Sequence, residues 1–220
     1  MPNAATAPIV GFDLDMTLVD SSAGIAATFR AALAELGREV SAEQVWPLVG
    51  IPLEAMARSL VPDLDPGPVT RRYRELYPER GVDSVTPLPG AFDAFDAVHA
   101  AGGRVLVVSA KVETGLRAVL KHVGLDRHAD EVVGGLFAEG KGGALRAHGA
   151  QAYVGDHPGD VTAARSAGAV AVGVATGPFS AEQLLASGSD VVLADLTEFP
   201  AWLDRFLDRG LSDRGAVLPG

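Results

Sequence analysis

Two aspartates one residue apart, Asp13 and Asp15, directly follow a short apolar run that begins at Pro8 and ends at Phe12. An apolar run of this length, bounded by polar residues, is typical of a strand buried in a sheet. Both carboxylates then lie at the C-terminal tip of the strand, where open α/β sheets bind ligands. Two neighbouring anions need a cation, a shared proton or different roles. Mg²⁺ is the usual cation, because it binds one or two carboxylates together with a substrate phosphate.

Two other interpretations of this segment compete with a magnesium site. A calcium loop of the D-x-[DN]-x-[DN]-G type needs Gly at its sixth position, and this chain has Leu18 and Val19 where polar residues should be. An aspartate at the end of a strand also serves as a turn residue or helix N-cap. The segment alone leaves that purely structural role open.

The composition excludes several classes of protein. The 220 residues are 48% hydrophobic and 21% charged, as in ordinary globular proteins. There is no cysteine, which excludes disulfides, thiolate catalysis and zinc sites built on sulfur. A formal net charge of −10 argues against nucleic acid or an anionic membrane as the partner. Without a signal-peptide pattern or an apolar run of ~20 residues, we expect a cytoplasmic protein.

Strand and helix patterns alternate from Leu88 to the end of the chain, which predicts an α/β fold with a doubly wound, Rossmann-like parallel sheet. Apolar runs predict strands over 104–108, 131–133, 152–154, 169–174 and 190–193. Helical periodicity predicts helices over 91–101, around 116–123, after 141, over 158–167, around 181 and over 199–207.

The stretch between the first strand and Pro87 reads instead as short helices broken by proline and glycine. An amphipathic helix carries Ile25, Phe29, Leu33 and Leu36, and Gly37 follows it. Further along, Ser41 and Gln44 fit a capping box, and an apolar stripe contains Tyr73, Leu76 and Tyr77. No buried strand is evident. We therefore predict a core domain of residues 1–20 and 87–220 and a helical domain of residues 21–86.

Three further polar sites fall at strand tips or on a neighbouring loop. Ser109 ends the strand over 104–108, where its hydroxyl can donate to a phosphoryl oxygen or cap a helix. Lys141 lies among glycines at the start of a helix and can neutralise charge, although Lys111 competes for that role. Asp156 ends another strand, and Asp160 follows at the start of a helix. A third carboxylate at the same edge is what a divalent metal site requires. His157, between them, fits a capping residue better than a base.

Together these residues resemble the four motifs of the haloacid dehalogenase superfamily in order and in sheet context. The motifs are Asp13-x-Asp15-x-Thr17, Ser109, Lys141 and Gly155-Asp156-x-x-x-Asp160. The helical insertion after the first motif is similar to the cap of phosphoglycolate-phosphatase-like members, as are Val49–Leu53, Tyr73–Tyr77 and Leu88–Gly90. The chain departs from the family at Met16, where Gly is commoner, and after Lys141, which lacks a following Pro.

The resemblance implies a Mg²⁺-dependent phosphomonoester hydrolase that acts through an aspartyl-phosphate. It makes Asp13 the nucleophile and Asp15 the general acid and base. It places Mg²⁺ between Asp13, the backbone carbonyl of Asp15 and Asp156, with Asp160 in the outer shell of the metal or orienting Lys141. The phosphoryl group would be bound by Ser109, Lys141, the backbone of Leu14, Asp15 and Ala110, and the loop that Thr17 orients.

Two other functions remain as alternatives. Phosphosugar mutases of the β-phosphoglucomutase type keep the second aspartate, but their cap carries the pattern Gly-x-x-Arg where this chain has Gly50–Leu53. They also favour a cap-linker His in the region that reads Ser21-Ser22-Ala23-Gly24 here. Both differences favour hydrolysis. The second alternative is a non-catalytic binding protein on the same fold. Dehalogenase chemistry is disfavoured, because those members lack the aspartate at the position of Asp15.

The expected partner is a small phosphorylated metabolite, with no nucleic acid and no membrane involved. Four arginines of the insertion are candidates to bind a carboxylate such as that of 2-phosphoglycolate, although ordinary surface arginines give the same pattern. They are Arg58, Arg71, Arg72 and Arg74. Sugar phosphates and nucleotides remain open as substrates, and the oligomeric state stays undetermined.

Overall fold

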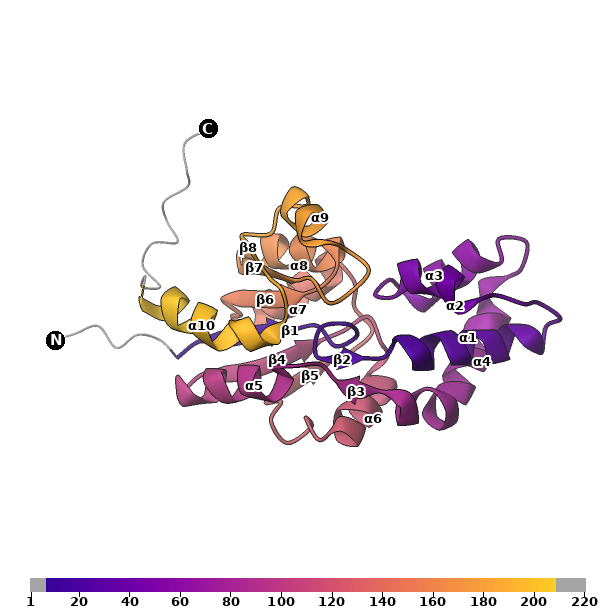
Figure 1. The fold of residues 1–220 in the computed structure, drawn as a ribbon, viewed down its shortest axis with the longest axis horizontal. Coiled ribbons are helices and arrows are strands. Elements are labelled where there is room, and N and C mark those ends of the chain that lie inside the picture. Colours follow the sequence, from indigo (N-terminus) through magenta and orange to yellow (C-terminus); the bar gives the residue numbers. More distant parts are fainter. Residues whose placement is uncertain (1–6, 209–220) are drawn as a thin grey trace.

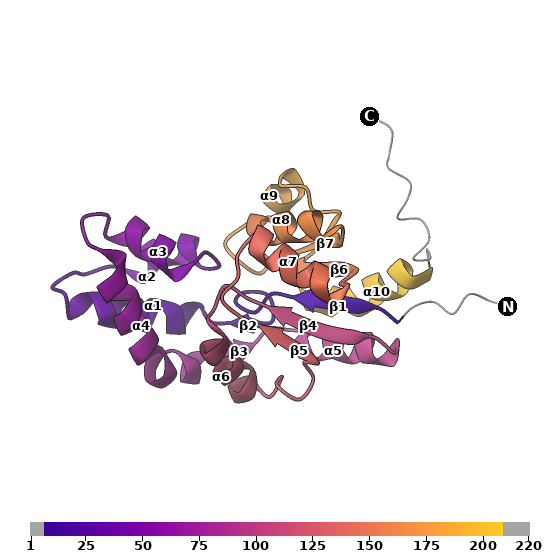
Figure 2. The same cartoon turned by 180° about the vertical axis from the view of Figure 1, so that it is seen from behind.

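The computed structural model describes residues 7–208. The ends of the predicted core domain, 1–6 and 209–220, lie outside the described residues. A sheet covered by helices occupies one end of the molecule, and a group of helices occupies the other (Figures 1 and 2). Among the described helices, none combines the length and the apolar character needed to cross a membrane.

The sheet contains six parallel strands in the order β5-β4-β1-β6-β7-β8. The strands are β1 (Ile9–Phe12), β4 (Arg104–Val108), β5 (Glu131–Val133), β6 (Ala152–Gly155), β7 (Val170–Val174) and β8 (Val191–Leu193). The chain passes from β1 to one edge of the sheet and then returns to the other. The predicted doubly wound fold is therefore confirmed, and the predicted strand boundaries agree to within one residue.

The central strand β1 lies between β4 and β6, with Phe12 opposite Val107 on one side and Val154 on the other. Because the three strands are parallel, their C-terminal ends lie at one edge of the sheet. The backbone N–H of Asp13 continues the ladder by donating to the carbonyl of Val154 at 2.9 Å. The sheet register thus fixes where the first aspartate emerges.

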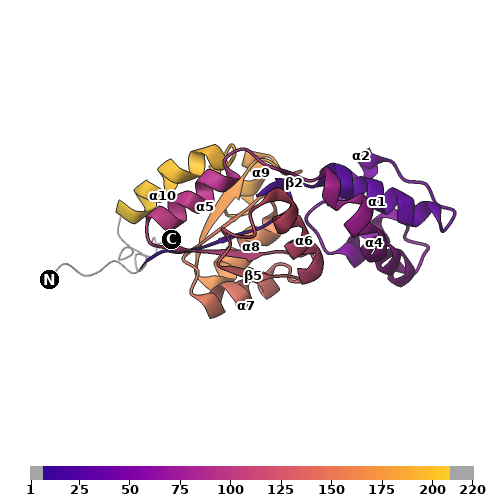
Figure 3. The same ribbon diagram turned by 90° about the horizontal axis from the view of Figure 1, so that it is seen from below.

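Helices cover both faces of the sheet, with α5 and α10 on one side and α7 and α8 on the other (Figure 3). The covering helices are α5 (Ala91–Ala100), α6 (Glu113–Val123), α7 (Glu139–His148), α8 (Pro158–Ala167), α9 (Ala181–Ala186) and α10 (Phe199–Asp208), with a 3₁₀ turn over Leu196–Glu198. Phe12 lies 5.2 Å, ring to ring, from both Phe95 and Phe199 on the first face. On the opposite face, a Cβ at Gly11 would lie 2.7 Å from Tyr153 and Leu145, so only glycine fits there.

The insertion after β1 is helical, as predicted. It contains α1 (Ser22–Ala34), α2 (Ala42–Val45), α3 (Leu53–Leu60) and α4 (Pro66–Arg80), with 3₁₀ turns over Trp46–Leu48 and Val82–Ser84. The capping box of Ser41 and Gln44 is present. In α4 the buried Tyr73 packs on Phe29 of α1, with ring centroids 4.7 Å apart. Burial of these aromatic faces holds the two longest helices of the insertion together.

Two features of the insertion differ from the sequence prediction. Leu36 was assigned to the apolar face of the first helix, but α1 ends at Ala34 and the Leu36 side chain is exposed. The sequence predicts no buried strand in this region, and the structure adds a short ribbon that the sequence did not indicate, in which β2 (Val19–Asp20) pairs antiparallel with the exposed β3 (Thr86–Pro87). Two-residue strands carry too little alternation to be recognised, and a proline argues against a strand. This ribbon joins the insertion to the sheet.

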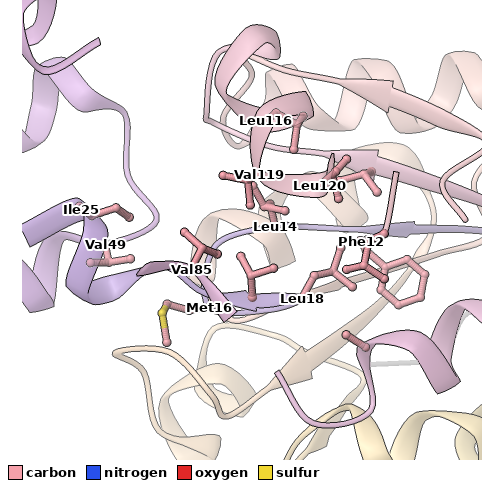
Figure 4. Close-up of a cluster of buried hydrophobic side chains, with 14 of the residues drawn as sticks. Phe12, Leu14, Met16, Leu18, Ile25, Val49, Val85, Leu116, Val119 and Leu120 are labelled. Carbon is pink, nitrogen blue, oxygen red and sulfur yellow. The ribbon is translucent and has the colours of Figure 1, made fainter. Parts of the chain in front are cut away.

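Apolar and polar residues alternate in the loop after β1. Leu14, Met16 and Leu18 belong to one buried cluster, in which Leu14 lies near residues of α6, Leu18 lies near Phe12 and Met16 points to the other side, whereas Asp13, Asp15 and Thr17 take the odd positions (Figure 4). The loop closes on itself, because the carbonyl of Leu14 accepts hydrogen bonds from the N–H groups of Leu18 and Val19. Met16 adopts a left-handed conformation with φ +59°, which suits glycine better, and burial of its side chain offsets that strain.

We expect Gly90→Ala to destabilise the protein more than Gly102→Ala. Both glycines have a positive φ, so a Cβ costs about 1–2 kcal/mol at each. At Gly90 that Cβ would also lie 2.3 Å from the backbone of Leu196 and Thr197, which adds about 1–3 kcal/mol of overpacking. At Gly102 no described atom lies within 4 Å of it. Urea unfolding of the two variants measures the difference, and equal losses would contradict the packing role of Gly90.

Candidate active site

The residues singled out in the sequence come together at the C-terminal edge of the sheet. Asp13 and Asp15 follow β1, Ser109 follows β4, and Asp156 follows β6. Lys141 and Asp160 come from the first turns of α7 and α8. All six side chains are buried. The helix predicted after Lys141 begins two residues before it, at Glu139, so the lysine points from within the helix.

Three carboxyl groups lie close together around one ammonium group, which pairs with two of them. Carboxylate oxygens of Asp13, Asp156 and Asp160 all lie within 4.8 Å of one another. The Nζ of Lys141 lies 2.9 Å from Oδ1 of Asp13 and 2.7 Å from Oδ1 of Asp160. The Lys141 side chain is only 1% exposed. One buried positive charge therefore faces three carboxyl groups, and charge at this density requires further compensation.

The turn between β6 and α8 positions two of these carboxylates. His157 caps α8, because its Nδ1 accepts a hydrogen bond from the N–H of Gly159 at 2.8 Å. Asp160 completes the capping box, since its Oδ2 accepts from the N–H of His157 at 3.1 Å. A Cβ at Gly155 would lie 2.4 Å from Cγ of Asp160, so glycine is needed at the strand end. His157 has the capping role expected for it.

Two carboxylate oxygens in the cluster lack a hydrogen bond. Thr17 Oγ1 donates to Oδ1 of Asp156 at 3.0 Å, but Oδ2 of Asp156 has no hydrogen-bond partner within residues 7–208. The same holds for Oδ1 of Asp13, which is near Lys141 without accepting a hydrogen bond from it. Gly177 leaves room beside Asp156, because a Cβ there would lie 1.8 Å from Oδ2. Orphaned, buried carboxylate oxygens close together suit a hard divalent cation.

Asp15 has a different set of partners. Ser21 Oγ donates to its Oδ1 at 2.6 Å, and the Nζ of Lys111 lies 3.3 Å from its Oδ2. The Lys111 ammonium also lies over the ring of Tyr77, 4.3 Å from the centroid. The two candidate lysines thus serve different carboxylates: Lys141 contacts Asp13 and Asp160, and Lys111 contacts Asp15. The Asp15 side chain lies outside the cluster of three carboxylates.

Burial dominates the ionisation of the cluster. It raises the pKa of Asp13 to about 7, although the Lys141 ammonium opposes the rise. Burial and the nearby carboxylates of Asp160 and Asp13 raise the pKa of Asp156 as well. Although burial lowers the pKa of Lys141, Asp13 and Asp160 outweigh it and raise the pKa well above its usual value. Lys141 is therefore charged, whereas Asp13 and Asp156 hold their protons more tightly than a free aspartate does, and a bound cation would favour their ionised forms.

The remaining predicted site residues lie beside this cluster. The Oγ of Ser109 accepts a hydrogen bond from the N–H of Lys111 at 3.1 Å, and its hydroxyl does not cap α6, whose N-cap is Val112. Ala110, next in the chain, lines the adjacent cavity. The Leu14 side chain is fully buried in the hydrophobic core, so only its backbone is left to face the site.

A cavity of about 310 Å³ opens onto Asp13, Asp15 and Ser109. The sheet side contributes α6 and the loop before α7, and the insertion contributes α1, α3 and α4. The site is therefore formed by the sheet edge and the helical insertion together.

Comparison with known families matches residues 10–174 to the haloacid dehalogenase-like hydrolases. A curated protein of Dickeya dadantii (strain 3937), named "Probable phosphatase IndB", is 30% identical over 211 residues, which cover 87% of this chain and 91% of the relative. A phosphoglycolate phosphatase of Agrobacterium fabrum is 26% identical over 96% of this chain and 98% of the relative.

Solved structures share the fold. A predicted phosphatase of Clostridium acetobutylicum superposes with a TM-score of 0.82 at 21% identity, covering 90% of this chain and 99% of that structure. A Thermotoga maritima protein, provisionally described as a β-phosphoglucomutase, reaches a TM-score of 0.70 at 18% identity, over 91% and 100% of the two chains. At these identities the likeness concerns the fold and leaves the reaction open.

We expect the metal-free protein to lose stability as the pH rises from about 4 to about 7, through Asp13. Its folded-state pKa of about 7 exceeds the unfolded value of 3.8, so over this window the folded state holds a proton that the unfolded state has released. Relative to Asp13→Asn, the free energy of unfolding should fall by about 1–4 kcal/mol across the window. Mg²⁺ should reduce this pH-dependent loss of unfolding free energy in the wild type and not in Asp13→Asn. Urea unfolding at several pH values measures the free energy of unfolding. Parallel profiles of this free energy against pH for the two proteins would refute the prediction.

Proposed function

The chain belongs to the haloacid dehalogenase-like hydrolases, and from this premise we propose that it hydrolyses small phosphomonoesters with Mg²⁺ as cofactor. The observation that carries the proposal is the arrangement at the end of β1. Asp13 belongs to a buried cluster of three carboxylates, and Asp15, two residues later, has its own lysine and hydroxyl partners. Two neighbouring carboxylates in different environments are suited to two different chemical roles.

Asp13 and Asp156 would hold the magnesium ion, together with the backbone carbonyl of Asp15, and Asp160 would lie in its outer shell. Their fit rests on the orphaned oxygens of Asp13 and Asp156. A bound Mg²⁺ would withdraw negative charge from the phosphoryl oxygens of the substrate. The Asp160 carboxylate keeps its contact with Lys141 and thereby orients the ammonium.

Asp13 would act as the nucleophile. A bond forms between one of its carboxylate oxygens and phosphorus while the bond from phosphorus to the ester oxygen breaks, giving an aspartyl-phosphate and an alcohol. Asp15 gives its proton to the departing oxygen. In the second step Asp15 takes a proton from water, whose oxygen bonds to phosphorus as the bond to Asp13 breaks. Phosphate leaves, and both aspartates return to their starting states.

Asp15 is held in place for both proton transfers. Ser21 Oγ fixes one carboxylate oxygen at 2.6 Å and Lys111 approaches the other at 3.3 Å, so the carboxyl group is oriented from two sides. The transferring phosphoryl group would be bound by Lys141, the Ser109 hydroxyl, the backbone amides of Leu14, Asp15 and Ala110, and the loop that Thr17 fixes through Asp156.

We further propose that residues 21–86 form a cap domain on a core of residues 1–20 and 87–220, and that the cap excludes water and selects the substrate. The reaction would take place in the cytoplasm. The phosphoglycolate phosphatase of Agrobacterium fabrum makes 2-phosphoglycolate one candidate substrate. Of the four arginines considered for its carboxylate, Arg74 alone lines the cavity among the described residues. Arg72 pairs instead with Glu35 and Glu75.

Asp13→Asn should abolish hydrolysis of p-nitrophenyl phosphate and of a panel of small phosphoesters. The amide cannot attack phosphorus, so kcat should fall at least about 10³-fold, whereas the exposed Asp93→Asn should stay within about twofold of the wild type. Chelation of Mg²⁺ should have the same effect as Asp13→Asn, and readdition should restore turnover. The rate of phosphate release measures turnover in the variants, in the presence of chelator and after Mg²⁺ is added back. Wild-type rates in Asp13→Asn would contradict the proposal.

The mutase alternative predicts a different product. Incubation with a hexose 1-phosphate should release inorganic phosphate or leave the ester intact if the protein is a hydrolase. A mutase would convert it to the hexose 6-phosphate with no net phosphate release. Phosphorus NMR of the same mixture distinguishes these outcomes, and conversion to the 6-phosphate would replace the hydrolase proposal.

A further inference from the structure

The cavity beside Asp13 and Asp15 is lined mainly by apolar and aromatic side chains away from its phosphoryl end. These residues come from the insertion and from the loop before α7. They include Ile25, Ile51, Leu53, Met56, Tyr73 and Phe137. Walls of this kind favour a ligand with apolar surface, because contact removes that surface from water.

The two cationic residues that line the cavity are already paired. The Nη2 of Arg74 lies 2.6 Å from Oε1 of Glu54, which lines the same cavity. Lys111 is paired with Asp15 and lies over the ring of Tyr77. A substrate carboxylate would therefore have to displace Glu54 or compete with Asp15 for its cation. The cavity is poorly suited to an anionic leaving group.

Tyr77 adds an aromatic ring to this apolar wall. The residue is 4% exposed, and its hydroxyl oxygen is fully buried. The ring stacks on Tyr73, with centroids 5.4 Å apart and planes inclined by 23°. Tyr77 can thus pack its ring against an apolar or aromatic group of the substrate.

The volume of the cavity also exceeds what a two-carbon leaving group fills. At about 310 Å³ it holds on the order of ten water molecules, each occupying roughly 30 Å³. A glycolate group would leave much of that water in contact with apolar walls. A ring-sized group would displace it.

We propose that the natural substrate is a phosphomonoester whose leaving group carries a neutral ring or another bulky, largely apolar group that packs against the ring of Tyr77. This inference rests on the proposed hydrolase function. It assigns substrate selection to Tyr77, to the apolar wall and to the Arg74–Glu54 pair, which withholds a cation from carboxylated substrates.

Three esters of primary alcohols test the proposal: benzyl phosphate, ethyl phosphate and 2-phosphoglycolate. The wild type should hydrolyse benzyl phosphate with a kcat/KM at least about tenfold above those of the other two, since burial of a ring gains discrimination of that order. A kcat/KM for 2-phosphoglycolate equal to or above that for benzyl phosphate would overturn the proposal.

Glu54→Gln frees the Arg74 guanidinium in a partly exposed pair outside the core, so the variant should fold. It should raise the kcat/KM for 2-phosphoglycolate relative to benzyl phosphate by at least about threefold, because a cation becomes available to the carboxylate. Glu35→Gln is the matched control, since it removes one carboxylate from Arg72, which keeps Glu75 as a partner and does not line the cavity. An unchanged ratio in Glu54→Gln, or the same change in both variants, would refute the role of the Arg74–Glu54 pair.

Tyr77→Ala should lower the ratio of kcat/KM for benzyl phosphate to that for ethyl phosphate by at least about threefold, because it removes part of the aromatic wall. An unchanged ratio would overturn the role of Tyr77.

Binding separates failure of this inference from failure of the proposed function. If no ester is hydrolysed, benzylphosphonate and phosphonoacetate can be titrated calorimetrically in the presence of Mg²⁺. Tighter binding of benzylphosphonate would uphold the substrate class while the hydrolase proposal fails. Tighter binding of phosphonoacetate would overturn the substrate class.

Discussion

The repulsion among three buried carboxylates is the constraint on which this structure depends. Carboxylate oxygens of Asp13, Asp156 and Asp160 lie within 4.8 Å of one another, and the one ammonium among them, that of Lys141, pairs with Asp13 and Asp160. Such a cluster forms only because parallel strands deliver their ends to one edge and because glycine at 155 lets the chain approach Asp160. Burial raises the pKa of Asp13 to about 7 against the attraction of Lys141, the Asp160 carboxylate adds to the rise, and a divalent cation would favour the ionised carboxylate.

The loop after β1 links this polar cluster to the apolar interior. Its odd-numbered residues, Asp13 to Thr17, are the candidate site residues, and its even-numbered residues, Leu14 to Leu18, anchor it in the core (Figure 4). The same cluster of buried side chains continues into the insertion through Ile25 and Val49. The position of the catalytic loop and that of the helices over the cavity are therefore fixed by one continuous hydrophobic core.

Much of this arrangement could be predicted from the sequence, because apolar runs that end in Asp13, Ser109 or Asp156 mark both the strands and the site edge. The β2–β3 ribbon could not, since two-residue strands have no periodicity to detect. Nor could the sequence decide between Lys111 and Lys141. Their different partners depend on Lys141 pointing from the first turn of α7 and on Lys111 following β4, which are tertiary relations. The catalytic and metal-binding roles themselves remain predictions.

Calorimetric titration of Mg²⁺ into the wild type and Asp156→Asn tests whether the buried carboxylates bind a divalent cation. We expect one Mg²⁺ per chain in the wild type and at least about tenfold weaker binding in Asp156→Asn, because the variant loses a buried carboxylate oxygen that has no other partner among the described residues. The exposed Asp93→Asn should bind as the wild type does. Equal Mg²⁺ binding by the wild type and Asp156→Asn, or no binding by the wild type, would contradict the account.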